Sequence, residues 1–150
     1  MPGAFYQQMM DRHFRRSGRL FYRPRCIGCQ ACVPIRLDVR TFAASRSQER
    51  SAKKNTDVVV RWQKPVLDAE RVALSTVYFY FDPAESKRSL GVYSALQEIA
   101  YARGAGLTHY YLGYYISDCR KMEYKAGLGD HELLEPGGWQ KKTRRLNVTP

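Results

Sequence analysis

The sequence lacks any long run of apolar residues, and this absence limits the classes of protein to which it can belong. No segment of the 150 residues approaches the roughly 20 apolar residues that a membrane-spanning helix needs. The stretch MPGAFYQQMMDRHFRR also lacks the apolar centre of a secretion signal. We therefore expect a cytoplasmic protein that has no membrane partner.

Cysteine is scarce, and three of the four cysteines stand close together. Cys26, Cys29 and Cys32 occur in CIGCQACVPIR, which begins like the cluster-binding run of bacterial ferredoxins. A ferredoxin run would place its fourth cysteine where this sequence has Arg36, so an electron carrier would have to use the distant Cys119. In a reducing cytosol, closely spaced thiols bind metal or react rather than forming structural disulfides.

Acidic residues are few relative to basic ones. The 25 lysines and arginines outnumber the 14 aspartates and glutamates, which gives a net charge of +11. This excess favours an acidic partner, and RNA rather than DNA is the leading candidate. A basic face that contacts only solvent is the alternative. Basic residues gather at 12–25, 45–54 and 141–145, where they are able to contact phosphates.

The composition is that of a folded protein, because 44% of the residues are hydrophobic and 13% are aromatic. A change in character at Lys64-Pro65 divides the chain into a basic, cysteine-bearing lobe at 1–62 and a second half at 66–150. Within the first lobe, the polar segment 45–55 predicts a solvated helix or loop, and 33–37 predicts a short strand.

The second half has the pattern of a βαβ unit. Residues 75–81 alternate in the manner of a strand, and Ser89 is expected to cap a helix that continues to about Gly104. The aromatic run HYYLGYYI at 109–116 predicts a second strand, in which Gly113 suggests the close approach of another backbone or a ligand. A helix between two strands predicts parallel pairing, and therefore an α/β fold.

Several longer motifs resemble those of one protein family. In chain order they are FRRSGRLFYRPRC, CxxCxACVPIR, SRSQ, STVYFYFDP, RSLGVYSALQEIAYARG, LTHYYLGYYI and CRKMEYKAG. Over about residues 5–62 and 70–139 they resemble the aminoacyl-tRNA–protein transferases. The order and sequence of the motifs are similar to those of the bacterial branch, which transfers leucine to N-terminal Asp or Glu. Eukaryotic members of the family transfer arginine.

The resemblance implies an acetyltransferase-like α/β domain in which the amino-acid ester of tRNA replaces acetyl-coenzyme A. The implied partners are an aminoacyl-tRNA and a protein that begins with Asp or Glu, which the added residue marks for degradation. We expect leucine as the donor residue, with arginine as the alternative, and no cofactor is required for transfer.

The sequence also departs from the family, which begins earlier. Between Trp62 and Leu74 the family has a long additional stretch, whereas this chain has only QKPVLDAERVA. The sheet should be narrower as a result. A non-catalytic homologue that binds tRNA or metal is therefore the alternative to an active transferase.

The chemistry of transfer indicates candidate catalytic and tRNA-binding residues. The nucleophile is an α-amino group with a pKa of about 7.7–8.0, so orientation and hydrogen-bond donors to the oxyanion are sufficient in principle. The candidates for the donor role are Tyr80, Tyr114 and Tyr115. The candidates for tRNA binding are Arg120, Lys121, Tyr124 and Lys125, which belong to the family's C-x-K-M-x-Y-K pattern.

Two other sites are expected. An arginine should bind the acidic acceptor residue, because it holds a carboxylate through two parallel hydrogen bonds, and Arg36 and Arg46 are candidates. Cys26, Cys29 and Cys32 are candidate ligands of a zinc ion or an iron–sulfur cluster. A closed site needs a fourth ligand, and three reduced thiols in a tight turn are the alternative.

Overall fold

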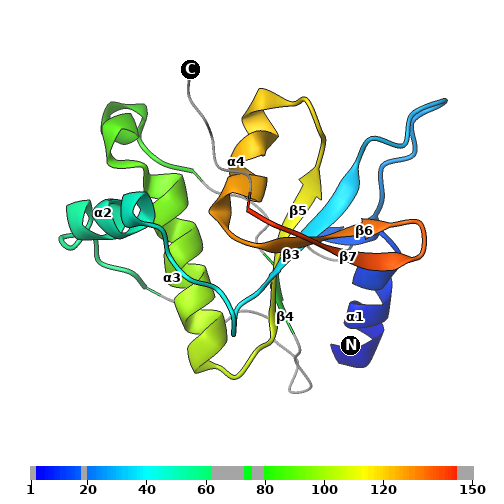
Figure 1. Cartoon of the computed structure of the whole chain (residues 1–150), viewed down its shortest axis with the longest axis horizontal. Helices are drawn as coiled ribbons and strands as arrows, with labels where there is room; N and C mark the ends of the chain where they lie inside the picture. The colour runs from blue at the N-terminus through cyan, green and yellow to red at the C-terminus, as the bar shows by residue number, and fades with distance from the viewer. Residues whose placement is uncertain (1–2, 18–19, 62–72, 76–79, 145–150) are drawn as a thin grey trace.

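The structure, a computed structural model, describes residues 3–17, 20–61, 73–75 and 80–144. In chain order its elements are α1 (Gly3–Asp11), β1 (Arg15–Ser17), β2 (Leu20–Tyr22), β3 (Val33–Asp38), α2 (Arg46–Lys54), β4 (Ala73–Ser75), the 3₁₀ helix η1 (Pro83–Arg88), α3 (Leu90–Gly104), β5 (His109–Tyr115), α4 (Arg120–Leu128), β6 (His131–Glu135) and β7 (Gly138–Lys142). Figure 1 shows the helices arranged around a central sheet. The predicted α/β class is confirmed.

The central sheet has five strands in the order β4-β5-β3-β6-β7. Strands β4 and β5 are parallel, with Ala73 opposite His109, which confirms the predicted βαβ unit. All other neighbours in this sheet are antiparallel, so the sheet is mixed. Strand β3, which comes from the cysteine-bearing part of the chain, lies at the centre between β5 and β6. The division into two lobes stays a prediction.

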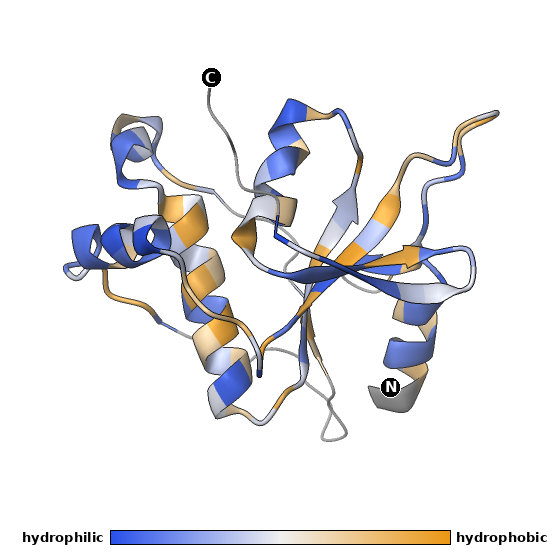
Figure 2. Ribbon diagram, in the orientation of Figure 1, coloured by the Kyte–Doolittle hydropathy of each residue, from blue (hydrophilic) through white to orange (hydrophobic). Residues whose placement is uncertain are grey.

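The hydrophobic core lies between one face of the sheet and the helices α3 and α4 (Figure 2). Alternate residues of a strand point to the same face, and Ile35 and Leu37 of β3 are accordingly both buried. The core is completed by Tyr110, Leu112, Tyr115, Ala95, Ile99, Ala102, Ala126 and Leu128. The βαβ unit thus contributes both a strand and its connecting helix to the core.

The start of α3 differs from the prediction that Ser89 caps it with its side chain. Ser89 has a left-handed backbone, with φ of 55°, and makes no side-chain capping bond. The reason is that Ser89 also ends η1, so that its own N–H bonds to the carbonyl of Ser86 at 3.4 Å. It forms the corner between two helices rather than a free N-terminus.

The predicted strand at 75–81 is only partly observed. Ser75 is the last residue of β4, while Tyr80 and Phe81 are outside any strand. Residues 76–79 lie outside the described residues. The predicted strand at 109–116 is confirmed as β5.

The polar segment at 45–55 forms helix α2, which Figure 2 shows as largely hydrophilic. Its first turn is closed by a capping box between Ser45 and Gln48. The side-chain amide of Gln48 also donates to the Leu128 carbonyl at 2.7 Å. The helix is therefore anchored by polar contacts. No helix among the described residues is long and apolar enough to cross a membrane.

Helix α1 contacts the sheet through polar side chains. The amide of Gln7 donates to the Tyr111 hydroxyl at 2.6 Å, and the indole N–H of Trp139 donates to Asp11 at 2.9 Å. These contacts join the first helix to β5 and β7. Helix α1 thus makes polar contacts with the sheet, whereas α3 and α4 contribute apolar side chains to the core.

Candidate functional site

An apolar groove of about 580 Å³ lies beside α3. The apolar side chains that line it are Val58, Val60, Leu74, Tyr80, Phe81, Leu90, Tyr93 and Tyr101. Asp82, Glu85 and Glu98 also line it, and Glu98 accepts a hydrogen bond from Ser94 at 3.0 Å. The groove thus combines apolar side chains with three carboxylates and the guanidinium of Arg61, and it is formed partly by the βαβ unit.

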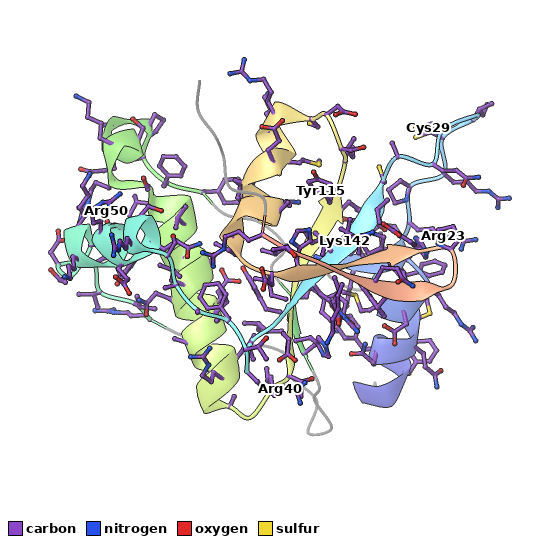
Figure 3. The ribbon with its side chains drawn as sticks, in the orientation of Figure 1. Arg23, Cys29, Arg40, Arg50, Tyr115 and Lys142 are labelled. Carbon is purple, nitrogen blue, oxygen red and sulfur yellow. The ribbon has the colours of Figure 1, made fainter. Side chains whose placement is uncertain are left out.

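Of the three candidate catalytic tyrosines, Tyr80 lines this groove, and its side chain is 84% exposed. Tyr114 lies elsewhere, because its hydroxyl donates to the His13 carbonyl at 2.6 Å, and burial raises its pKa to about 12. Tyr115 is buried and lines a separate cavity with His131 and Lys142. Figure 3 labels Tyr115 and Lys142. The three hydroxyls therefore do not share one cavity.

Arg36, a candidate for acceptor binding, is held on β3 by several side chains. Its Nε lies 2.6 Å from Glu132, its Nη1 lies 3.0 Å from the Tyr111 hydroxyl, and Asp11 is 3.7 Å away. The guanidinium also lies over the ring of Trp139, with 3.9 Å between Cζ and the ring centroid. A substrate carboxylate would have to compete with Glu132 for this arginine.

Arg46, the other candidate, is exposed at the first residue of α2. Arg36 lies at the centre of the sheet, whereas α2 packs on α3. The two candidate arginines are therefore not brought together.

The four candidate tRNA-binding residues all lie on α4, but they do not face the same environment. Arg120, Lys121 and Tyr124 are exposed. Lys125 turns inward, and its Nζ donates to the Tyr114 carbonyl at 2.7 Å. Burial lowers the pKa of Lys125, and the neighbouring Arg15 lowers it further.

Arg15 is a residue that sequence reasoning missed. It is only 6% exposed, and burial lowers the pKa of its guanidinium. It meets Lys125 at Gly113, where φ is +89° and the pairing of β3 with β5 shifts in register. A Cβ added to Gly113 would lie 3.5 Å from Arg15 Nη2 and 3.6 Å from Lys125 Nζ. The neighbours of this glycine are thus two cationic side chains, and the expected approach of a backbone or a ligand stays a prediction.

The cysteine turn lies on a loop that extends away from the sheet, where Figure 3 labels Cys29. The N–H of Cys29 bonds to the Cys26 carbonyl at 3.3 Å, and Gly28 between them has φ of +70°. Cys26 and Cys29 are exposed, whereas Cys32 is half-buried. Burial raises the pKa of the Cys32 thiol, and the thiols of Cys26 and Cys29 raise it further.

The structure does not confirm the zinc or iron–sulfur site that the sequence predicts at this turn. The three cysteines line a cavity of about 550 Å³ together with His13 and Arg23. In the part of the chain that the structure describes, no three His, Cys, Asp or Glu side chains gather in a way that would hold a metal ion. No chemical step is therefore assigned to a metal here.

Both parts of the chain match models of one enzyme family. A model described as the N terminus of arginine-tRNA-protein transferase matches residues 2–50, and a model described as its C terminus matches residues 44–135. The residues that form the groove beside α3, the two cations at Gly113 and helix α4 all lie within the matched ranges.

Curated bacterial proteins are also similar to the chain. Aspartate/glutamate leucyltransferase of Chromobacterium violaceum is 32% identical over 197 residues, which cover 93% of this chain and 81% of the relative. The enzyme of the same name from Saccharophagus degradans is 33% identical over 192 residues, which cover 89% and 81%. Both alignments are longer than the 150 residues of the chain, so these relatives contain internal residues that have no counterpart here. The chain belongs to the arginine-tRNA-protein transferase family.

Proposed function

We propose that this protein transfers leucine from leucyl-tRNA to the α-amino group of proteins that begin with Asp or Glu. The observation that carries the proposal is the similarity to aspartate/glutamate leucyltransferases, because it extends over 93% of the chain and includes both the cysteine-bearing part and the βαβ unit. The net charge of +11 supports an RNA partner. The product would be a protein marked for degradation.

The apolar groove beside α3 is the proposed site for the aminoacyl end of the tRNA. A leucyl side chain is apolar, and its transfer from water to apolar surroundings is favourable by about 1.5–3 kcal/mol. Leu74, Leu90 and Tyr93 offer such surroundings, and the exposed ring of Tyr80 offers a surface on which the terminal adenine can stack. The groove is open, which suits the end of a large substrate.

Arginine is the second candidate donor, because the groove also contains carboxylates. Asp82, Glu85 and Glu98 line it beside Arg61, and carboxylates favour a guanidinium over an isobutyl group. The description of the matching family models also names arginine. A test of the function must therefore supply both aminoacyl-tRNAs.

The reaction needs orientation more than acid–base chemistry. The neutral α-amine of the acceptor attacks the ester carbonyl carbon, the new C–N bond forms, and the bond to the ribose oxygen breaks. The proton lost by the amine goes to the departing ribose oxygen. The amine has a pKa of about 7.7–8.0, so a useful fraction is neutral near pH 7.5. Tyr80 is the proposed hydrogen-bond donor to the ester, because it lines the groove.

The exposed residues Arg120, Lys121 and Tyr124 on α4 are proposed to contact the tRNA. Lysine and arginine side chains on a helix surface attract phosphates, and an exposed tyrosine can stack on an unpaired base. Binding that depends on such contacts weakens steeply as salt is added. A cytoplasmic location follows from the use of aminoacyl-tRNA as a substrate.

A zinc ion or an iron–sulfur cluster at Cys26, Cys29 and Cys32 stays a prediction from the sequence, and the proposed transfer does not depend on it. Anaerobic reconstitution with iron and sulfide, followed by absorbance spectroscopy, tests the cluster. A colourless protein that also binds no zinc would remove both forms of the prediction.

The experiment that tests the function is the transfer of labelled leucine, with labelled arginine in parallel, from charged tRNA to peptides that begin with Asp, Glu, Lys or Ala. We expect leucine on the Asp and Glu peptides. Arginine on the same peptides would change the donor. A folded protein that binds tRNA and transfers neither amino acid would identify the chain as a non-catalytic, tRNA-binding relative.

A further inference from the structure

We propose that Arg15, Lys125 and the open backbone of Gly113 form a cradle that binds the side-chain carboxylate of the acceptor's N-terminal Asp or Glu. The identity of this ligand rests on the proposed function, whereas the existence of an anion site rests on the geometry of the cradle alone. The proposal assigns acceptor binding to residues other than the two arginines that the sequence suggested, Arg36 and Arg46.

The geometry is that of two cationic side chains that approach the same glycine. Gly113 has φ of +89°, a conformation that residues with a side chain rarely adopt. A Cβ at this position would lie 3.5 Å from Arg15 Nη2 and 3.6 Å from Lys125 Nζ. The two cationic nitrogens therefore face the same point above the strand. A side chain at residue 113 would occupy the position that a ligand oxygen needs.

The electrostatics favour an anion at this point. Arg15 is 6% exposed, and the groups that favour its charged form are the phenols of Tyr6, Tyr22, Tyr111 and Tyr114. Lys125 is influenced by Arg15, which opposes its charge, and by the thiol of Cys119. Burying two cations beside each other is unfavourable, and a carboxylate between them would offset that cost.

A carboxylate fits the cradle better than a phosphate of the tRNA backbone does. Phosphates of a folded RNA are reached by exposed side chains, and α4 offers Arg120 and Lys121 for that purpose. Arg15 is buried, so its ligand must be a small group on a slender chain. The planar guanidinium also matches the planar carboxylate, to which it can donate two parallel hydrogen bonds.

The cradle lies on β5, which pairs with β4, and β4 contributes to the lining of the proposed donor groove. Leu74 lines the groove, and the next residue, Ser75, is opposite Tyr111 of β5. Gly113 follows Tyr111 by two positions, which corresponds to about 7 Å along a strand. An acceptor held at Gly113 would thus lie close to the end of the βαβ unit.

Peptide binding by the full chain tests the cradle without any transfer step. Fluorescence anisotropy would compare labelled peptides that begin with Asp, Glu, Asn or Ala. We expect the wild type to bind the Asp and Glu peptides at least about tenfold more tightly than the Asn and Ala peptides. Lys125→Met and Arg15→Gln should each remove most of this difference, whereas Lys125→Arg, which keeps the charge, should retain it. Lys87→Met, which removes an exposed lysine of η1, is the matched control and should have no effect.

Gly113→Ala provides a second, independent test, because it fills the cradle without removing a charge. It should also weaken binding of the Asp and Glu peptides, and circular dichroism at the assay temperature would verify that each variant is folded. If Arg15→Gln does not fold, Lys125→Met and Gly113→Ala still decide the outcome. Wild-type protein that binds all four peptides equally would overturn the proposal.

Transfer kinetics separate this inference from the proposed function. In Lys125→Met, the KM for Asp peptides should rise about tenfold while the KM for leucyl-tRNA is unchanged. A rise only in the KM for leucyl-tRNA would assign the two cations to the RNA and overturn the proposal. Selective binding of acidic peptides by wild-type protein that transfers no amino acid would refute the function and support the cradle. Normal transfer by both Lys125→Met and Arg15→Gln would support the function and refute the cradle.

Discussion

The Nε of Arg36 donates a hydrogen bond to the Glu132 carboxylate over 2.6 Å, and this bond joins the central strand β3 to β6. Both side chains are largely buried, at 12% and 15% exposure. The Tyr111 hydroxyl and the ring of Trp139 hold the same guanidinium. Arg36 therefore connects the central strand to strands on both sides of it, and its charge already has a carboxylate partner.

Glu132→Ala should lower the free energy of unfolding by about 2–3 kcal/mol, because it leaves a largely buried guanidinium without its nearest carboxylate. Urea denaturation monitored by circular dichroism measures this loss. Glu49→Ala, which removes an exposed carboxylate from α2, should cost no more than about 0.5 kcal/mol. Equal losses in the two variants would show that the Arg36–Glu132 bond adds nothing to stability.

Tyr114→Phe should destabilise the protein by about 1 kcal/mol at pH 7, because it removes the hydroxyl that donates to the His13 carbonyl. The pKa of Tyr114 is raised to about 12 from 10.0 by burial. The unfolded chain therefore loses this proton at a lower pH than the folded protein does, and the stability that Tyr114 contributes should decline from pH 10 to about 12.

The measurement is urea denaturation of both proteins at pH 7, 9 and 10.5. The wild type should lose more stability than Tyr114→Phe between pH 9 and 10.5. Parallel losses in the two proteins would contradict the raised pKa, although they would leave the effect at pH 7 intact.

At the other end of the pH range, Asp38 should make the protein sensitive to acid. Arg40 donates to both carboxylate oxygens, and these hydrogen bonds lower the pKa of Asp38 from 3.8 to about 2. A carboxyl group with a lowered pKa stabilises the fold fully above its unfolded value, and this stabilisation is lost as the pH falls through about 2. Asp38→Asn should therefore lose less stability than the wild type between pH 4 and 2. Thermal denaturation at those two pH values measures the difference, and identical changes would exclude the assignment.

The sequence predicted those elements of the fold whose conformation depends on residues that are close together in the chain. Strand β5 was predicted from the run HYYLGYYI at 109–116, in which aromatic and apolar side chains dominate, and the parallel pairing of β4 with β5 follows from the helix between them. The role of Ser89 was not predictable, because its backbone is set by a second helix that ends at the same residue. Nor does the local pattern of β3 reveal that it lies at the centre of the sheet, since the choice of partner strands depends on contacts between distant residues.

The candidate site likewise combines a feature that the local sequence predicts with one that depends on distant contacts. Gly113 was singled out because glycine is unfavourable within a strand, and the structure brings two side chains to it. Arg15, however, is one of several arginines in RHFRRSGR, and nothing in that run distinguishes the buried Arg15 from the exposed Arg12. The tyrosines that influence its charge come from α1, β2 and β5, of which β5 is distant in the sequence. Sequence reasoning therefore located the position of the cradle but not one of the two cations that face it.

The thiols of the cysteine turn should differ in reactivity. Cys26 and Cys29 are exposed, whereas Cys32 is half-buried and has a raised pKa because burial and the two neighbouring thiols disfavour its thiolate. The thiolate is the reactive form, so Cys32 should react more slowly with iodoacetamide than the other two at pH 8. Mass spectrometry of peptides from a labelling time course measures the order, and unfolding in urea should make the three rates similar. Faster labelling of Cys32 in the folded protein would contradict this arrangement.

The proposed donor groove is best tested at two adjacent valines, of which only one lines the groove. Val60 lines the groove, whereas Val59 is 77% exposed and is not part of the lining. Val60→Glu would place a charge where an apolar leucyl or adenosine group should bind, and it should raise the KM for leucyl-tRNA about tenfold. Val59→Glu adds the same charge beside the groove and should change this KM much less. Neither substitution should alter the KM for the acceptor peptide. Equal effects of the two variants would mean that general repulsion of the RNA, rather than occupation of the groove, determines the result.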